Sequence, residues 1–123
     1  MPLDDLGSRL LLAGFSVRGP VDQPMAERLL ADLALNMEVS PVHSPTIYCY
    51  PSGGKGGTGF TLIQPITESF LAVDAWPDHG GAYLVLASCK WFDVDVVERV
   101  LNLLGLTVVG RTYTGLTLDH AQN

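Results

Sequence analysis

Glu68, Ser69 and Cys89 are residues whose types and predicted proximity could support chemistry. A serine hydroxyl, a thiol and a carboxylate can act as nucleophile, proton donor and base when they lie within hydrogen-bonding reach. Their proximity depends on a hairpin that the sequence predicts between them. The two apolar strands and the turn segment of this hairpin span residues 70–76, 82–87 and 77–81.

The loop of this hairpin decides which residues face each other. If residues 77–81 (Pro-Asp-His-Gly-Gly) form the whole loop, Trp76 faces Ala82. Carried along the strands, this register sets Ser69 opposite Cys89. Directly opposed residues point to the same face, with Cβ atoms about 4.5–5.5 Å apart. The sequence therefore predicts that the hydroxyl and the thiol meet at the open end of the hairpin.

These residues and their spacing resemble one family, the short prokaryotic S-adenosylmethionine decarboxylases, which are pyruvoyl enzymes that cut their own chain. The family signature is a Glu-Ser pair, a strand carrying histidine, a Trp-Pro-Glu turn and a cysteine that closes the next strand. The matching residues, with the family's spacing from serine to cysteine, are Glu68-Ser69, Trp76-Pro77-Asp78 and Cys89. Asp74 departs from the pattern, because it stands where the family has histidine. A weaker similarity extends from Gly7 to about Gly115.

The resemblance implies a self-processing role for Ser69. In the family, the serine hydroxyl attacks the carbonyl of the preceding residue, here Glu68, and the chain divides between them. The serine becomes a pyruvoyl group, the electron sink in the decarboxylation of S-adenosylmethionine for polyamine biosynthesis. Outside this motif, a serine in this place would merely begin a strand. No metal site is indicated, since His43, His79 and His120 are scattered without ligand spacing.

Cys89 and Asp74 take catalytic positions by the same resemblance. Cys89 would be the acid that returns a proton to the substrate's α-carbon, although a lone cysteine is more commonly a buried apolar side chain. The family histidine stabilises the processing intermediate and removes the α-proton of the serine. Asp74 can replace it as a base, but an ionised carboxylate cannot donate a hydrogen bond to an oxyanion. Strand alternation also places Asp74 on the face opposite Ser69, and His79 in the turn is an alternative donor.

Trp76, Asp78 and Tyr50 are candidate substrate-binding residues. The resemblance places Trp76 and Asp78 near the substrate, where an aromatic ring stacks on adenine, and Asp78 is one methylene shorter than the family glutamate. Tyr48 or Tyr50 could supply a second aromatic wall, and Trp76 could equally be a core side chain that binds no ligand. A glycine-rich segment at 52–59 lacks the Walker pattern and is interpreted as a flexible loop, a lid or part of an interface.

Composition narrows the classes of partner. The chain of 123 residues is 47% hydrophobic and only 16% charged, which favours a further buried surface and hence a homodimer. A net charge of −6 argues against nucleic acid and anionic membranes as partners. No apolar run reaches the ~20 residues of a membrane span, and no signal peptide is evident. We expect a cytoplasmic protein with free thiols, in which Cys49 is simply packed.

The remaining elements predict an α/β (α+β) fold of one domain, residues 1–123. Helix caps are expected at Asp22 and Asp93, and Gly105 is placed to end the second helix. Strands outside the hairpin are predicted at 10–17, 44–50, 60–66 and 106–114. Pro65 is expected to cause a bulge or an early exit from its strand. Hairpins combined with two amphipathic helices favour a two-layer sandwich, with both helices on one face of an antiparallel sheet.

Three functional hypotheses follow. The first is a pyruvoyl-dependent decarboxylase of the S-adenosylmethionine decarboxylase type, processed at Ser69. The second keeps the pyruvoyl chemistry but acts on another amino acid. The third is an unprocessed homologue that binds a ligand or a partner subunit without chemistry, which the carboxylate of Asp74 favours because processing needs a donor to the oxyanion.

Overall fold

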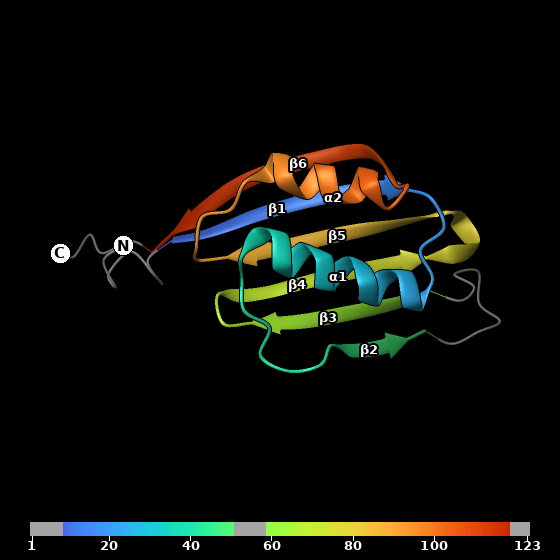
Figure 1. Cartoon of the computed structure of the whole chain (residues 1–123), viewed down its shortest axis with the longest axis horizontal. Coiled ribbons are helices and arrows are strands. Elements are labelled where there is room, and N and C mark those ends of the chain that lie inside the picture. The colour runs from blue at the N-terminus through green and yellow to red at the C-terminus, as the bar shows by residue number, and fades with distance from the viewer. Residues whose placement is uncertain (1–8, 51–58, 119–123) are drawn as a thin grey trace.

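The protein forms one antiparallel sheet with two helices on one face, as the computed structural model shows (Figure 1). The structure describes residues 9–50 and 59–118, so the glycine-rich segment 52–59 lies outside the described residues except for Gly59. The elements are β1 (Arg9–Arg18), α1 (Gln23–Met37), β2 (Thr46–Cys49), β3 (Phe60–Ile66), β4 (Ser69–Trp76), a 3-10 turn (Pro77–His79), β5 (Gly81–Ser88), α2 (Val94–Leu103) and β6 (Thr107–Thr117). The expected fold class is confirmed.

The six strands lie in the order β2-β3-β4-β5-β1-β6, and every neighbouring pair is antiparallel. Alternate residues of β4 and β5 are buried against the helices, as in Leu71, Val73 and Leu84. The residues between them point to the other face, which no described element covers and which is here named the open face (Figure 1). Exposed apolar side chains on the open face include Tyr48, Phe70, Tyr83 and Val85. Within the described residues, the sheet therefore has one core-forming face and one uncovered face that carries exposed apolar side chains.

Both helices begin at the expected caps, and α2 ends at the expected glycine. The Asp22 carboxylate accepts a hydrogen bond from the Met25 amide at 2.9 Å, and Asp93 caps α2 through the amide of Asp95 at 2.9 Å. Gly105 has φ of 82°, which a residue with a side chain rarely adopts, and this ends α2. No helix in the described residues is long and apolar enough to cross a membrane.

The predicted register of the central hairpin is wrong by one residue. Trp76 pairs with Gly81 rather than with Ala82, so the loop has four residues, 77–80. The physical reason is that Gly80, with φ of 70°, closes the 3-10 turn, which leaves Gly81 free to adopt an extended conformation. Gly81 also pairs with Arg18 of β1, which holds it in the sheet.

Pro65 causes neither a bulge nor an early exit. It stays in β3, where it pairs in regular register with Phe70 of β4. On the other side of β3, the pairing with β2 runs only from Phe60 to Ile63, so no β2 residue requires an N–H from Pro65. The Pro65 carbonyl instead accepts a hydrogen bond from the Val42 amide at 3.1 Å.

Candidate active site

The bond between Glu68 and Ser69 lies at the two-residue turn that joins β3 to β4. Ile66 pairs with Ser69 across this turn, so only Thr67 and Glu68 lie outside the strands. On its other side, Ser69 pairs with Ser88, the last residue of β5. Ser69 is therefore the first residue of a strand that is paired with β3 on one side and with β5 on the other.

Backbone hydrogen bonds hold the residues that flank this bond. The Cys89 amide donates to the Glu68 carbonyl oxygen at 3.0 Å, which is the carbonyl that Ser69 would attack. The Ser40 amide donates to the Glu68 carboxylate at 3.0 Å. The Thr67 amide donates in turn to the Ser40 carbonyl at 2.8 Å. The candidate scissile carbonyl is thus positioned and already polarised by an N–H group.

Ser69 does not face Cys89, contrary to the sequence-based register. Its partner is Ser88, whose side chain is fully buried, while Cys89 is half-buried and lies opposite Glu68. The Ser88 hydroxyl donates to the Lys90 carbonyl at 2.7 Å and accepts from the Lys90 amide at 3.0 Å. Sequence reasoning missed Ser88, although a four-residue loop at 77–80 would have indicated it.

Asp74 lies on the open face, away from Ser69, as alternation predicts. The Thr61 hydroxyl donates to the Asp74 carboxylate at 3.2 Å, and the hydroxyls of Thr61 and Tyr50 are 2.5 Å apart. Asp74 is five positions along β4 from Ser69, a distance of about 16 Å. Within one chain, Asp74 is therefore too distant to act directly on Ser69.

Trp76 is an aromatic centre at the opposite end of β4. Its indole ring stacks on Tyr50 with centroids 5.4 Å apart and planes inclined by 8°. His79 meets the same indole edge-on at 6.2 Å. Of the two candidate tyrosines, Tyr50 is the one that contacts Trp76, and Asp78 lies between Trp76 and His79 in the turn.

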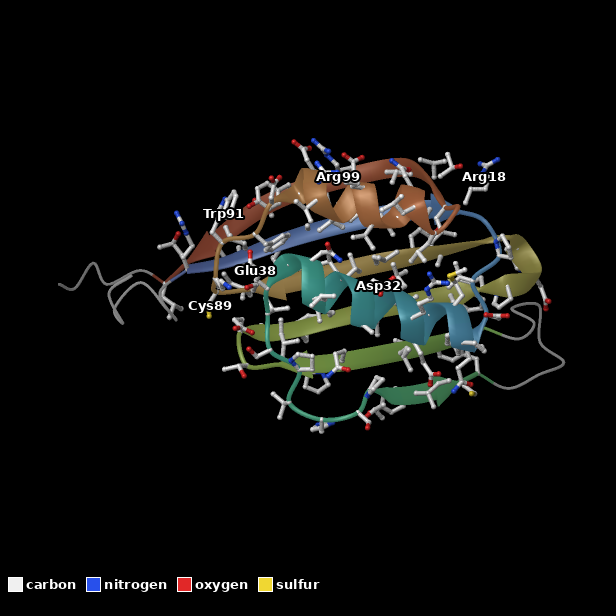
Figure 2. The ribbon with its side chains drawn as sticks, in the orientation of Figure 1. Arg18, Asp32, Glu38, Cys89, Trp91 and Arg99 are labelled. Atoms are coloured by element: carbon white, nitrogen blue, oxygen red, sulfur yellow. The ribbon has the colours of Figure 1, made fainter. Side chains whose placement is uncertain are left out.

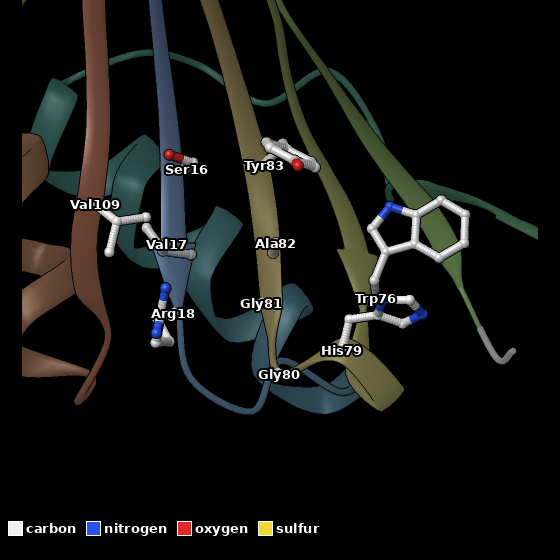
Figure 3. A pocket seen from close by; sticks show the side chains of 10 residues that line it. All are labelled: Ser16, Val17, Arg18, Trp76, His79, Gly80, Gly81, Ala82, Tyr83 and Val109. Carbon is white, nitrogen blue, oxygen red and sulfur yellow. The ribbon is translucent and has the colours of Figure 1, made fainter. Parts of the chain in front are cut away.

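An open cavity of about 780 Å³ adjoins this aromatic centre (Figure 3). Its floor is formed at Gly81, which has no side chain and lies between Trp76 of β4 and Arg18 of β1. Ser16, Tyr83 and His79 complete the principal polar and aromatic lining. An indole and a guanidinium on either side of a glycine floor can bind a planar ring next to an anionic group.

Gly59 lies directly against the indole ring of Trp76, and replacement of Gly59 by alanine tests this contact. A Cβ atom at residue 59 would lie 2.5 Å from two carbons of the indole ring, so Gly59→Ala must displace the ring. We expect Trp76 to lose its stacking on Tyr50 and the protein to lose about 1–3 kcal/mol of stability. Tryptophan fluorescence in a Trp91→Phe background and denaturant unfolding measure both effects.

Gly115→Ala is the matched control for this substitution. Its Cβ would meet Leu11 at 3.6 Å, an ordinary contact, so the fluorescence of Trp76 should not change. An unchanged spectrum in Gly59→Ala as well would contradict the packing of Trp76 described above.

The two ends of β4 are well separated. Ser69 and Trp76 are seven residues apart on one strand, about 23 Å, and alternation assigns them to opposite faces. Figure 2 shows the same separation for residues near them, since Cys89 and Arg18 lie at opposite ends of the molecule. A single small molecule therefore cannot contact both residues of one chain.

Among the described residues, no group of three His, Cys, Asp or Glu side chains could hold a metal ion. Both cysteines are free thiols, and Cys49 is exposed, which corrects the expectation that it is packed. The chemistry available at the two ends of β4 is therefore that of hydroxyl, thiol, carboxylate and aromatic groups.

Comparisons with known proteins agree with this architecture. No family model and no curated protein matches the sequence. One solved structure that matches is the adenosylmethionine decarboxylase from Aquifex aeolicus VF5, with a TM-score of 0.56 over 89% of this chain and 88% of that chain. The chain has an adenosylmethionine decarboxylase-like fold. The sequence identity is 15%, so the likeness concerns the fold, and activity has to be argued from the site.

Proposed function

We propose that this protein is a pyruvoyl-dependent decarboxylase of the S-adenosylmethionine decarboxylase type, which cleaves its own chain between Glu68 and Ser69. The observation that supports this most directly is the hydrogen bond from the Cys89 amide to the Glu68 carbonyl. It polarises the carbonyl next to Ser69 in a fold that matches a decarboxylase along nearly its whole length. The product would enter polyamine biosynthesis.

Residues around Ser69 are compatible with a pyruvoyl group formed from it. Ser69 begins β4, so after cleavage it would be a chain end that its pairing with Ser88 still holds in place. Bound at this position, the group supplies a ketone that withdraws electrons from the substrate's α-carbon as carbon dioxide leaves. The Cys89 thiol, on the residue next to Ser88, would return a proton to that carbon.

The distance between Ser69 and Trp76 along β4 implies that the working unit is a homodimer. Trp76, Tyr50 and Asp78 would bind substrate about 23 Å from Ser69 of their own chain. A second copy packed on the open face in the reverse direction would bring its Trp76 end to the Ser69 end of the first. Because alternation assigns the Ser69 side chain to the helix-covered face, a substrate held by that Trp76 would reach the pyruvoyl group around the end of β4. Exposed apolar side chains on the open face, such as Tyr83 and Val85, fit such an interface.

We expect a dimer of about twice 13.2 kDa at micromolar concentration. Sedimentation equilibrium measures this, and a double substitution of Tyr83 and Val85 by glutamate should give monomers, because like charges would face each other across the two-fold axis. As a control, glutamate in place of Leu35, which is exposed on α1, should leave the dimer intact. A monomeric wild type would exclude a site shared between two copies.

The proposed activity is tested by mass and by product. Self-cleavage gives two fragments divided between Glu68 and Ser69, and the second begins with a pyruvoyl group that borohydride reduces. Carbon dioxide release from carboxyl-labelled S-adenosylmethionine tests the substrate. Release from a different amino acid instead would retain the chemistry and replace the substrate. An intact chain with no release would exclude the decarboxylase.

One observation favours a second candidate, an unprocessed homologue that binds a ligand. Asp74 accepts a hydrogen bond from Thr61 on the open face, so it does not supply the donor that histidine supplies in the family. In that case the cavity at Gly81, between Trp76 and Arg18, would be the binding site. Binding of S-adenosylmethionine by an uncleaved chain, measured by calorimetry, supports this candidate.

A further inference from the structure

A closed set of hydrogen bonds surrounds the bond between Glu68 and Ser69. On one side, the Cys89 amide donates to the Glu68 carbonyl at 3.0 Å, and the Ser40 amide donates to the Glu68 carboxylate at 3.0 Å. On the other side, the Lys90 ammonium donates at 2.5 Å to the carbonyl of Glu38, two residues before Ser40. The segments that follow α1 and β5 therefore hold Glu68 between them.

Ser88 is the buried centre of this arrangement. Its hydroxyl is fully buried and both donates to and accepts from the backbone of Lys90, at 2.7 and 3.0 Å. The two bonds span Cys89 and fix the orientation of the chain on either side of it. A buried hydroxyl that makes two hydrogen bonds resists rotation, because breaking either bond leaves an unpaired polar group.

We propose that the main-chain N–H of Cys89 is the oxyanion donor for self-cleavage, and that Ser88 is the residue that positions it. This inference rests on the proposed processing at Ser69 and concerns its first step alone. The Ser69 hydroxyl oxygen bonds to the Glu68 carbonyl carbon, and negative charge collects on the oxygen that already accepts from Cys89. The C–N bond to Ser69 then breaks, and the hydroxyl proton passes to the departing nitrogen, which leaves an ester and a free amine.

This donor compensates for the absence of the family histidine at residue 74. A main-chain N–H is always protonated, so it can donate at any pH, whereas an ionised Asp74 can only accept. It also needs no movement, since the N–H is aligned with the carbonyl oxygen before the attack. Donors of this kind that are fixed in advance typically accelerate acyl transfer about 10²–10³-fold.

Hydroxylamine tests the first step by itself, because it cleaves the ester at neutral pH while the amide stays intact. Two variants separate the N–H from the thiol: Cys89→Ala lacks only the thiol, and Cys89→Pro lacks both groups. We expect hydroxylamine to release fragments divided between Glu68 and Ser69 at least about 100-fold faster from Cys89→Ala than from Cys89→Pro. Equal rates in two folded variants would overturn the proposal, as would a wild type and an Asp74→His variant that both resist hydroxylamine.

The positioning role of Ser88 has a spectroscopic readout that does not depend on cleavage. The chain has two cysteines, so ¹⁵N-cysteine labelling gives two amide signals. In Ser88→Ala we expect the Cys89 amide to exchange with solvent faster and the hydroxylamine rate to fall, with recovery of both in Ser88→Thr. A Cys89 amide that Ser88→Ala leaves unchanged would overturn the assignment. The ester without a later pyruvoyl group would refute the proposed decarboxylase and leave this inference standing.

Discussion

Asp74→His is expected to cleave its own chain at least about 100-fold faster than the wild type at neutral pH. Conversion of the ester to a pyruvoyl group requires a base for the α-proton of Ser69, and histidine is well suited to that task at neutral pH. Residue 74 is about 16 Å from Ser69 of its own chain, so this base would come from the second copy of the proposed dimer, whose Trp76 end lies at the Ser69 end of the first. In the wild type, the Thr61 hydroxyl donates a hydrogen bond to the Asp74 carboxylate, so we expect slow cleavage. Intact mass after timed incubation gives the rate, and borohydride identifies the new terminus.

The control for this result is Asp74→Asn, which removes the charge without supplying a base. Asp74→Asn should cleave no faster than the wild type. Ser69→Ala should not cleave, whether residue 74 is aspartate or histidine. Full and rapid cleavage of the wild type would show that Asp74 is an adequate base. Intact chains in both the wild type and Asp74→His would assign the loss of processing to another residue.

Mixing two inactive variants is expected to restore decarboxylation. Ser69→Ala lacks the source of the pyruvoyl group, and Trp76→Ala lacks the aromatic ring for the substrate. In a mixed dimer, one of the two shared sites takes Ser69 from one copy and Trp76 from the other. Random exchange makes half of the dimers mixed, so roughly a quarter of the wild-type activity should return.

This prediction depends on the separation of about 23 Å along β4. Coexpression of the two variants, followed by measurement of labelled carbon dioxide, provides the test. Trp76→Ala expressed alone is the control, and it should stay inactive at every protein concentration. Inactivity of the mixture, with mixed dimers demonstrated by mass, would mean that both residues serve a site within one chain.

Much of the fold was predictable from local chemistry. Asp22, Asp93 and Gly105 mark the helix ends through hydrogen bonds and a backbone angle that depend on neighbouring residues alone. The strand order was not predictable, because it depends on contacts between segments distant in sequence. β1 lies between β5 and β6, for example, and nothing in its composition indicates those partners.

The residue types of the candidate site were predictable from the sequence, but the predicted pairing of β4 with β5 was wrong by one residue. Gly80 and Gly81 are both acceptable in a turn, so composition did not distinguish a loop of four residues from one of five. The difference moves every pairing by one residue and replaces Cys89 by Ser88 opposite Ser69. The main-chain hydrogen bond from Cys89 to Glu68 has no side-chain signature, and only the three-dimensional structure reveals it.

The strand order has a consequence for what a cut after Glu68 would leave behind. The first fragment would carry β1, β2, β3 and α1, and the second would carry β4, β5, β6 and α2. In the sheet these strands are interleaved, so the fragments meet at the β3–β4, β5–β1 and β1–β6 boundaries. Neither fragment contains a continuous sheet, since β1 stands between two strands of the second fragment. A cleaved molecule would therefore stay together and unfold as one cooperative unit, and the fragments would fold only in each other's presence.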